Sequence, residues 1–382
     1  MTPGARVAAA ISVLDRVLAG EPAEKALVNW ARSSRFAGSG DRAAVRDHVF
    51  DALRRMRSAA ALGGAATGRG LMLGVLRAQG VDPAALFTGD GHAPAPVGAN
   101  EAQRPMTELE ALDCPDWLAP QMRESLGADF APVMQALQSR APVFLRVNLR
   151  KATVARAQAV LEAEGIGTRP HPLAATALEV TTGARRIAAS ASYREGLVEL
   201  QDVASQAVVQ ALPLTDGMRV LDYCAGGGGK SLAMAAQARL DLTAHDADPR
   251  RMADLGPRAA RAGVRVKTVE TAALSGGYDL VLADAPCSGS GAWRRSPEAR
   301  WRLDVARLDA LNAAQDAVLD AAAVQVAPGG WLAYATCSLL ACENAERVAA
   351  FLARASRFRL ERDLRLTPLD GGDGFYLALL KG

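Results

Sequence analysis

Apolar positions recur along the chain with two different periods, and the change of period divides the sequence. In residues 5–87 they repeat every three to four positions, as Val7, Ile11 and Leu14 do, which predicts helices that bury one face. Residues 88–106 are rich in Gly, Pro and Ala and show no period, which is typical of a linker or long loop. The first part of the chain is therefore expected to be helical.

Beyond the linker, short patterns of both kinds precede a longer regular series. We expect short helices over 117–126 and 131–138, strands at 143–148, 177–182 and 196–202, and a helix over 152–165. Further strands are expected at 219–223, 242–246, 264–269, 278–283 and 331–336, with helices between them, and at 358–367 and 374–380. Strands that alternate with helices indicate a doubly wound parallel sheet.

The change of pattern also predicts the domain organisation. We expect an all-α domain at 1–87, a linker at 88–110, a small α+β module at 111–205 and an α/β domain at 206–382. The net charge of +3 and the pI of about 8.7 permit a nucleic-acid partner without requiring one. No uncharged apolar run reaches 18 residues, and charged residues interrupt the first apolar stretch, so neither a membrane span nor a signal peptide is expected.

The cysteines give no sign of a disulfide framework or of a metal site. Their number is odd and no two of them form a C-x-x-C pair, so we expect a reducing, cytoplasmic location and no bound zinc. The five are Cys114, Cys224, Cys287, Cys337 and Cys342.

The first strand of the regular series runs into a glycine cluster, VLDYCAGGGGKS at 220–231, which allows backbone to approach a ligand closely. A Walker A loop would need glycine where Cys224 stands, and a dinucleotide fingerprint would need Gly or Ala where Ser231 stands. A loop that binds S-adenosylmethionine needs neither, and it is completed by an acidic residue at the end of the second strand, here Asp246. These features suit any adenosine ligand, and the alternative is that Asp246 caps the next helix.

Two cysteines stand in nearly matching contexts, DAPCSGSG and YATCS. Cys287 follows the fourth strand of the series and Cys337 ends the fifth, and in the usual strand order these are neighbours about 5 Å apart. Two thiols would then face one crevice beside the adenosine ligand. The alternatives are that both cysteines are small core residues or that they form a redox pair.

Paired thiols beside a methyl donor fit one chemistry, the methylation of cytosine at C5. The C5 carbon is a poor nucleophile until a thiolate adds to C6, and the adduct must afterwards lose the C5 proton and release the enzyme. Asp284 is placed to hold the ring at N3 and N4. Lys230, at the mouth of the glycine loop, would polarise the site or lower the pKa of a thiol.

These residues resemble the RNA cytosine-5 methyltransferases of the ribosomal small-subunit methyltransferase B, nucleolar protein 2 and Sun family. The cysteine motifs and CAGGGGK are similar to family motifs, as are PDWL at 115–118, LRVN at 145–148, LQDVASQ at 200–206, RRSPEARW at 294–301 and GGDGF at 371–375. The resemblance covers about residues 110–382. Residues 1–87 resemble the helical antitermination-factor-B-like RNA-binding domain that precedes the catalytic core of the bacterial small-subunit enzyme.

The resemblance implies a class I methyltransferase with a Rossmann-like doubly wound sheet, with S-adenosyl-L-methionine as cofactor and RNA as partner. We expect the protein to be a monomer. It implies Cys337 as the nucleophile on C6, Cys287 as the residue needed for product release, and Asp284 beside Lys230 as the contact to the base. The expected cofactor contacts are Cys224, Ala225, Gly226, Gly227, Gly228, Gly229, Lys230, Asp246 and Asp284. The expected substrate is 16S ribosomal RNA; the alternatives are transfer RNA, or an RNA-binding assembly factor with little catalysis.

Two features depart from the family pattern. Gly227 stands where the family usually has proline, at that position or next to it, so we expect a more pliable loop. The acidic residue that the family places near the adenine has no clear counterpart, and only Glu270 and Thr271 are available for that contact.

The segment WRRSPEARWR at 293–302 mixes arginine with tryptophan directly after the first cysteine motif. This composition is typical of surfaces that grip unstacked RNA, through phosphate pairing and base stacking. The alternative is a surface loop whose tryptophans are anchored in the core.

Overall fold

The computed structural model describes all residues from Met1 to Gly382, and the chain folds into two compact units. Residues 1–140 and 293–302 form the helical unit, and residues 141–292 and 303–382 form the sheet unit. This grouping differs from the module expected at 111–205, whose first helices belong to the helical unit and whose strands belong to the sheet unit.

A buried aspartate explains why the first helices of that module join the helical unit. The Asp113 carboxylate accepts hydrogen bonds from the backbone N–H groups of Arg57 and Ser58, at 2.8 and 3.0 Å. It also accepts from the Ser58 hydroxyl and from Gln138 Nε2, both at 2.8 Å. Burial raises the pKa of Asp113, and these donors compensate the loss of water around its carboxylate.

Nine α-helices make up the helical unit, as the periodicity predicts for its N-terminal part. Thr67 caps α5 by accepting from Gly70 N at 3.1 Å. Helices α4 and α5 approach closely because a glycine lies at their contact: a Cβ on Gly74 would stand 1.9 Å from the carbonyl oxygen of Ala59. The helices are α1 (Pro3–Leu18), α2 (Ala23–Ser33), α3 (Ser39–Arg54), α4 (Met56–Gly63), α5 (Gly68–Ala78), α6 (Glu108–Ala111), α7 (Ala119–Leu126), α8 (Phe130–Leu137) and α14 (Pro297–Arg302).

The segment WRRSPEARWR places two of its side chains in the core of the helical unit. Trp293 and Arg300 have 0% exposure, and the Arg300 guanidinium lies 5.1 Å from the centre of the Trp293 ring. Arg300 Nη1 donates to the carbonyl oxygen of Asp113 at 3.0 Å, and Trp301 Nε1 donates to that of Leu53 at 2.7 Å. The expectation of RNA contact is therefore wrong for Trp293 and Arg300, and it stays a prediction for the exposed Arg295 and Arg302. The two buried side chains stabilise the helical unit through cation–π contact and buried hydrogen bonds.

The sheet unit begins with a small antiparallel sheet of four strands in the order β2-β3-β1-β4. Its strands are β1 (Phe144–Val147), β2 (Thr168–Pro170), β3 (Ala177–Val180) and β4 (Val198–Leu200), and its helices are α9 (Val154–Ala163) and α10 (Ala191–Arg194). One face of the sheet packs on α9 through a cluster that includes Leu145, Leu161, Leu178 and Val198. This arrangement agrees with the α+β pattern that the alternating residues predict.

A second, seven-stranded sheet follows, in the order β10-β11-β9-β8-β5-β6-β7. Strands β9, β8, β5, β6 and β7 are parallel, and β11 and β10 add antiparallel neighbours at one edge. The strands are β5 (Arg219–Asp222), β6 (Asp241–Ala244), β7 (Lys267–Thr268), β8 (Tyr278–Asp284), β9 (Val326–Thr336), β10 (Arg359–Leu366) and β11 (Phe375–Lys381). The doubly wound sheet is confirmed, and the strand expected at 264–269 is shorter because β7 is an edge strand paired with β6 alone.

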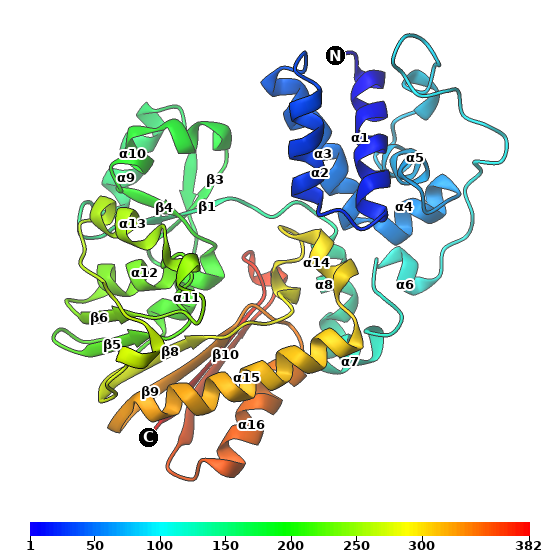
Figure 1. Ribbon diagram of the computed structural model, residues 1–382. Helices are drawn as coiled ribbons and strands as arrows, with labels where there is room; N and C mark the ends of the chain where they lie inside the picture. The colour runs from blue at the N-terminus through cyan, green and yellow to red at the C-terminus, as the bar shows by residue number, and fades with distance from the viewer. The chain divides into compact units, whose positions relative to one another are not determined.

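Helices cover both faces of this sheet (Figure 1). They are α11 (Val203–Gln210), α12 (Gly229–Gln237) and α13 (Leu255–Ala262) on one face, and α15 (Val305–Gln325) and α16 (Ala345–Arg354) on the other. Alternate strand residues face the two layers: Leu280 and Leu282 pack toward α11 and α12, whereas Val281 packs toward α15. The strand order reverses between β5 and β8, and ligands of such sheets bind where the carboxyl ends of strands meet this point.

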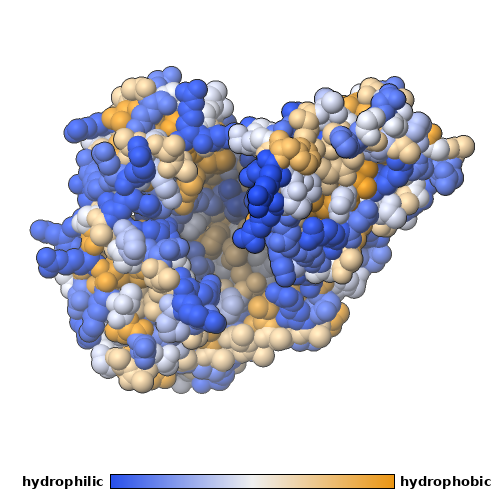
Figure 2. All heavy atoms as spheres, turned by 45° about the horizontal axis from the view of Figure 1, so that its top comes forward, coloured by the Kyte–Doolittle hydropathy of each residue, from blue (hydrophilic) through white to orange (hydrophobic).

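Polar side chains cover most of the face seen in Figure 2, with apolar ones in scattered places. The most exposed of the large apolar side chains, Phe36 and Val324, lie far apart in the sequence. No single helix is both long and apolar enough to cross a membrane, although α4 and α5, bent by 92°, meet that criterion as a pair. No cluster of three His, Cys, Asp or Glu side chains is arranged to hold a metal ion, and all five cysteines are free.

Candidate active site

The carboxyl ends of β8 and β9 bring two cysteines together. The strands are paired in parallel up to Asp284 and Ala335, and the turn after β8 is joined to β9 by a bond from Ala285 N to Ala335 O at 2.9 Å. The Sγ atoms of Cys287 and Cys337 lie 3.5 Å apart. The adjacency that the sheet topology predicts for the two thiols is therefore present in the structure.

A lysine and an aspartate form an ion pair in the same region. Lys230, on the first turn of α12, donates from Nζ to Asp284 Oδ2 at 2.5 Å, and the Phe375 ring centre lies 4.7 Å from Nζ. Burial lowers the pKa of Lys230, but the negative charges of Asp284 and Cys337 outweigh burial, so its pKa lies above the usual value. Lys230 therefore stays protonated, beside the carboxylate of Asp284 and within electrostatic reach of Cys337.

The two sulfurs are not equivalent. The pKa of Cys287 lies well above its usual value because the thiol hydrogen-bonds to Cys337, because it is buried, and because Cys337 and Glu343 carry negative charge nearby. Cys287 is thus the sulfur that keeps its proton. A thiolate is the nucleophilic form of cysteine, and the raised pKa disfavours that form at Cys287.

The glycine loop between β5 and α12 has a backbone that other residues would not adopt. Gly226 and Gly228 have φ angles of 51° and 78°, and a Cβ on Gly228 would stand 2.0 Å from Leu255 Cδ1. The carbonyl oxygen of Gly227 accepts a hydrogen bond from Arg258. The loop expected to be pliable at Gly227 is thus tied to α13 by this arginine.

Asp246 supports the glycine loop from the end of β6. It is 3% exposed, accepts from Gly226 N at 2.9 Å, and lies 3.3 Å from Arg251 Nη1. Of the two residues considered for the adenine contact, Thr271 already has a partner, since His245 Nε2 lies 2.8 Å from its hydroxyl oxygen. Asp246 therefore holds the loop and pairs with Arg251, whose side chain is 60% exposed.

These residues fit a nucleoside ligand such as S-adenosylmethionine. Gly226 leaves room for a ligand at the backbone, since a Cβ there would have as its nearest neighbour only Arg251, at 3.5 Å. Asp246 would offer a carboxylate to the ribose hydroxyls of such a ligand, and Cys224 is half-buried along the loop. The loop, Asp246 and the Lys230–Asp284 pair all lie at the carboxyl ends of β5, β6 and β8, where such a ligand would be bound.

Family models match two parts of the chain. A model described as 16S rRNA methyltransferase RsmB/F matches residues 209–381, and a model of the ferredoxin-like domain of the RsmF/B-like methyltransferases matches residues 114–185. The chain belongs to the RsmB/F methyltransferase family. The motif resemblance found in the sequence is thereby confirmed.

Individual relatives in this family agree with the match. Ribosomal RNA small subunit methyltransferase B of Vibrio cholerae is 34% identical over 281 residues, which are 70% of this chain and 64% of the relative. The protein of the same name from Xanthomonas campestris is 35% identical over 252 residues, 63% of this chain and 57% of the relative. The chain thus spans less than two thirds of the length of these relatives.

Solved structures show the same fold at lower identity. The crystal structure of PH0851 has a TM-score of 0.78 and 22% identity, and covers 100% of this chain and 99% of its own. The structure of NSun6 from Pyrococcus horikoshii with SFG has a TM-score of 0.62 and 18% identity, and covers 70% of this chain and 98% of its own.

The sequence did not reveal one polar group at the centre of this family site. Glu343 has 0% exposure, and its carboxylate accepts hydrogen bonds from Ser288 and Ser338, the residues that follow the two cysteines. The repeated Cys-Ser pair was the only sequence signal of this arrangement. Nothing in the spacing of positions 288, 338 and 343 indicates a shared partner.

A second residue that the sequence did not single out is Asp222, the last residue of β5. It is 1% exposed, and Ser231 Oγ donates to its Oδ2 at 2.6 Å. Burial raises the pKa of Asp222 to about 7, and the negative charge of Asp284 acts in the same direction. This carboxyl group therefore changes its charge near neutral pH beside the Lys230–Asp284 pair.

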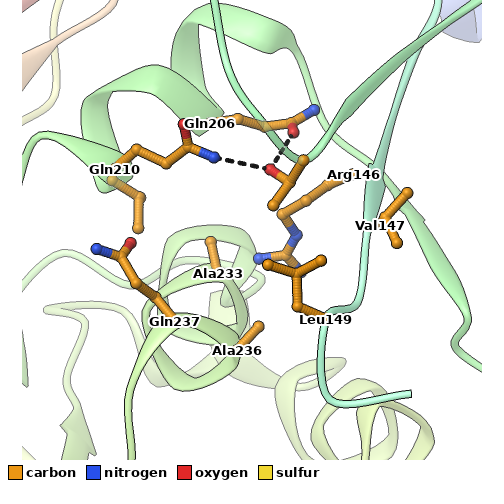
Figure 3. A pocket seen from close by; sticks show the side chains of 10 residues that line it. Arg146, Val147, Leu149, Gln206, Gln210, Ala233, Ala236 and Gln237 are labelled. Atoms are coloured by element: carbon orange, nitrogen blue, oxygen red, sulfur yellow. Dashed lines mark hydrogen bonds between the residues drawn. The ribbon is translucent and has the colours of Figure 1, made fainter. Parts of the chain in front are cut away.

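A separate cavity of about 110 Å³ lies between the small sheet and helices α11 and α12 (Figure 3). Arg146 enters it from β1, and Thr176, which also lines it, donates to Gln206 at 2.9 Å and accepts from Gln210 at 3.1 Å. Burial lowers the pKa of Arg146 to about 10. None of the site residues predicted from the sequence lines this cavity, so it is distinct from the site of the thiols.

Proposed function

We propose that this protein methylates C5 of cytosine in RNA with S-adenosylmethionine, through a covalent bond between Cys337 and C6, and that 16S ribosomal RNA is its substrate. The observation that carries the proposal is the pair of thiols at 3.5 Å beside the Lys230–Asp284 ion pair. Membership in a family whose model is described as 16S rRNA methyltransferase supports the choice of RNA.

Each residue of the site has a role in this reaction. S-adenosylmethionine, when bound by the glycine loop and Asp246, supplies the methyl group that C5 takes up. The Cys337 thiolate forms a bond to C6, and the electron pair of the C5–C6 double bond moves to C5, which becomes nucleophilic. Transfer of the C5 proton to a water molecule then restores the C5–C6 double bond, as the C6–S bond breaks and Cys337 leaves with its electron pair. Asp284, kept in place by Lys230, would hold the base at N3 and N4.

Cys287 is suited to the release of the product. Burial and the negative charge of Glu343, two of the causes that raise its pKa, remain while Cys337 is bound to the base, and they favour a protonated Cys287. That proton can pass to the Cys337 sulfur as it leaves C6, since the two sulfurs lie within hydrogen-bond distance. The target cytosine must leave its stack to reach both thiols, so the substrate site is single-stranded or the base is flipped.

The two cysteines can be tested separately with purified protein in reducing buffer. We expect Cys337→Ala to abolish methyl transfer to 16S RNA, read by bisulfite sequencing and by transfer of labelled methyl groups. We expect Cys287→Ala to accumulate a protein–RNA band that survives denaturation and that disappears in the double variant. Cys114→Ala, in the core of the helical unit, is the control.

The outcomes distinguish the alternatives. Turnover by Cys337→Ala at a rate near that of the wild type would refute the nucleophile assignment. Methylation of transfer RNA but not of 16S RNA would show that transfer RNA is the substrate, and the proposed chemistry would stand. Binding of RNA and cofactor by the wild type without any 5-methylcytosine would favour an assembly factor. A ribosomal RNA substrate implies a cytoplasmic enzyme, and sizing chromatography tests whether it is a monomer.

A further inference from the structure

Glu343 accepts four hydrogen bonds in the interior of the sheet unit. Its Oε1 accepts from Ser288 N at 2.7 Å and from Gln315 Nε2 at 3.0 Å. Its Oε2 accepts from the hydroxyls of Ser288 and Ser338, the latter at 2.5 Å. All four partner groups can donate, an arrangement that suits a carboxylate as the acceptor.

The two serines explain why both cysteine motifs continue with the same residue. After donating to Glu343, each hydroxyl still accepts one backbone N–H of its own turn: Ser288 from Ser290 at 3.3 Å, and Ser338 from Leu340 at 3.0 Å. A single carboxylate therefore fixes the turn after Cys287 and the turn after Cys337 together. The separation of the two sulfurs depends on this shared partner.

Helix α15 and the end of β9 complete the support. Gln315 donates from the same Nε2 to the carbonyl oxygen of Pro286, at 3.0 Å, directly before Cys287. The hydroxyl of Tyr334 donates to the backbone oxygen of Glu343 at 2.7 Å. Glu343 is thus held from both sides and cannot move without displacing the residues next to the thiols.

Connecting two turns through a buried charge is energetically unfavourable, because the carboxylate loses its hydration on folding. A well-packed apolar cluster would connect the same elements at lower cost. The charge has a second effect that an apolar cluster lacks, since it disfavours a thiolate at Cys287.

We propose that Glu343 is a positioning residue for the thiol pair, which holds the two cysteine turns in register and directs the proton of the pair to Cys287. The part that concerns RNA rests on the proposed function. The part that concerns the thiols does not, because the reactivity of the two sulfurs can be measured without a substrate.

Glu343→Gln is the sharpest test, since it removes the charge and keeps the shape. Serine hydroxyls accept as well as donate, so the amide nitrogen of the new side chain can donate to Ser288 and Ser338 while its oxygen keeps the other two donors. Glu346→Gln, on the exposed first turn of α16, is the matched control. Circular dichroism establishes that both variants fold.

The readout is the initial rate of alkylation of each sulfur by iodoacetamide between about pH 6 and pH 10, under single-hit conditions, resolved by mass spectrometry. In the wild type and in Glu346→Gln we expect Cys337 to react in strong preference to Cys287. In Glu343→Gln we expect the ratio of the two rates to fall about tenfold or more, the change that corresponds to one pKa unit. An unchanged ratio in folded Glu343→Gln would overturn the proposal.

Ser338→Ala keeps the Glu343 side chain and removes its hydrogen bond from the Ser338 hydroxyl. This variant serves as the test if Glu343→Gln does not fold. We expect the preference for Cys337 to remain while the protein–RNA adduct in the Cys287→Ala background forms about tenfold more slowly. Adduct formation at the original rate would show that the network does not position Cys337. If the thiol ratios change as expected but the wild type methylates no RNA, the proposed function fails and the role of Glu343 in ordering the thiols stands.

Discussion

Asp222 offers a test of the electrostatics at the carboxyl end of β5. Its carboxyl group is buried, and its pKa of about 7 lies far above the ordinary value of 3.8. The folded state therefore binds a proton that the unfolded chain releases between pH 3.8 and about 7. Since the folded state holds more protons over that interval, stability must fall as the pH rises through it.

The size of the effect follows from the two pKa values. Between pH 5.5 and pH 8.0 the unfolded carboxyl is fully ionised, and the folded one loses its proton only near the end of the interval. The linkage relation gives a loss of about 2 kcal/mol in the free energy of unfolding over this range. Asp222→Asn stays neutral at every pH and keeps an oxygen that accepts from Ser231, so this contribution should vanish.

Denaturant unfolding at the two pH values measures the contribution. As the pH rises from 5.5 to 8.0, Asp222 should lower the unfolding free energy of the wild type by about 2 kcal/mol. Asp222→Asn should lack this loss. Asp216→Asn is the control: hydrogen bonds from Arg239 lower the pKa of this exposed group, so it stays ionised across the interval. The same pH dependence in Asp222→Asn and wild type would refute the argument that burial controls this carboxyl.

Three further substitutions test other parts of the structure. Asp246→Ala should weaken S-adenosylmethionine binding at least tenfold by calorimetry, and unchanged affinity would exclude the ribose role. Gly228→Ala should destabilise the protein by about 2–4 kcal/mol, since strain at positive φ adds to a clash with Leu255. Its control is Gly217→Ala, which has positive φ but no neighbouring atoms and should destabilise the protein by about 1 kcal/mol. Arg300→Ala should destabilise the helical unit by about 3 kcal/mol, seen as faster hydrogen exchange in residues 1–140, and unchanged exchange would contradict a structural role.

The architecture of the sheet unit could be predicted from the sequence because the strand and helix patterns are local. Alternation of strand and helix patterns over 219–336 is sufficient to predict a doubly wound sheet, and the topology then places the ends of β8 and β9 side by side. The positions of Cys287 and Cys337 follow from these two steps. Their separate roles do not follow from topology, and in the sequence they came only from the family resemblance.

The segment WRRSPEARWR shows why composition alone does not predict an RNA-binding surface. Arginine and tryptophan serve RNA binding through stacking and ion pairing, and they serve a protein core through the same physical interactions. Only the tertiary environment distinguishes the two uses. Here Trp293 and Arg300 have 0% exposure within the helical unit, although the chain on either side of the segment belongs to the sheet unit.

Glu343 illustrates a second kind of information that a single sequence lacks. Its partners come from the turn after β8, from α15 and from the end of β9, so they are separated by 55, 28 and 5 positions. No local period connects such residues, and a glutamate beside a helix start is ordinarily a surface residue. Two thiols in similar turns would compete equally for one proton. Glu343 raises the pKa of Cys287 in addition to the hydrogen bond to Cys337 and burial, so under our proposal the chemical difference between two matching cysteine motifs depends in part on a residue outside both of them.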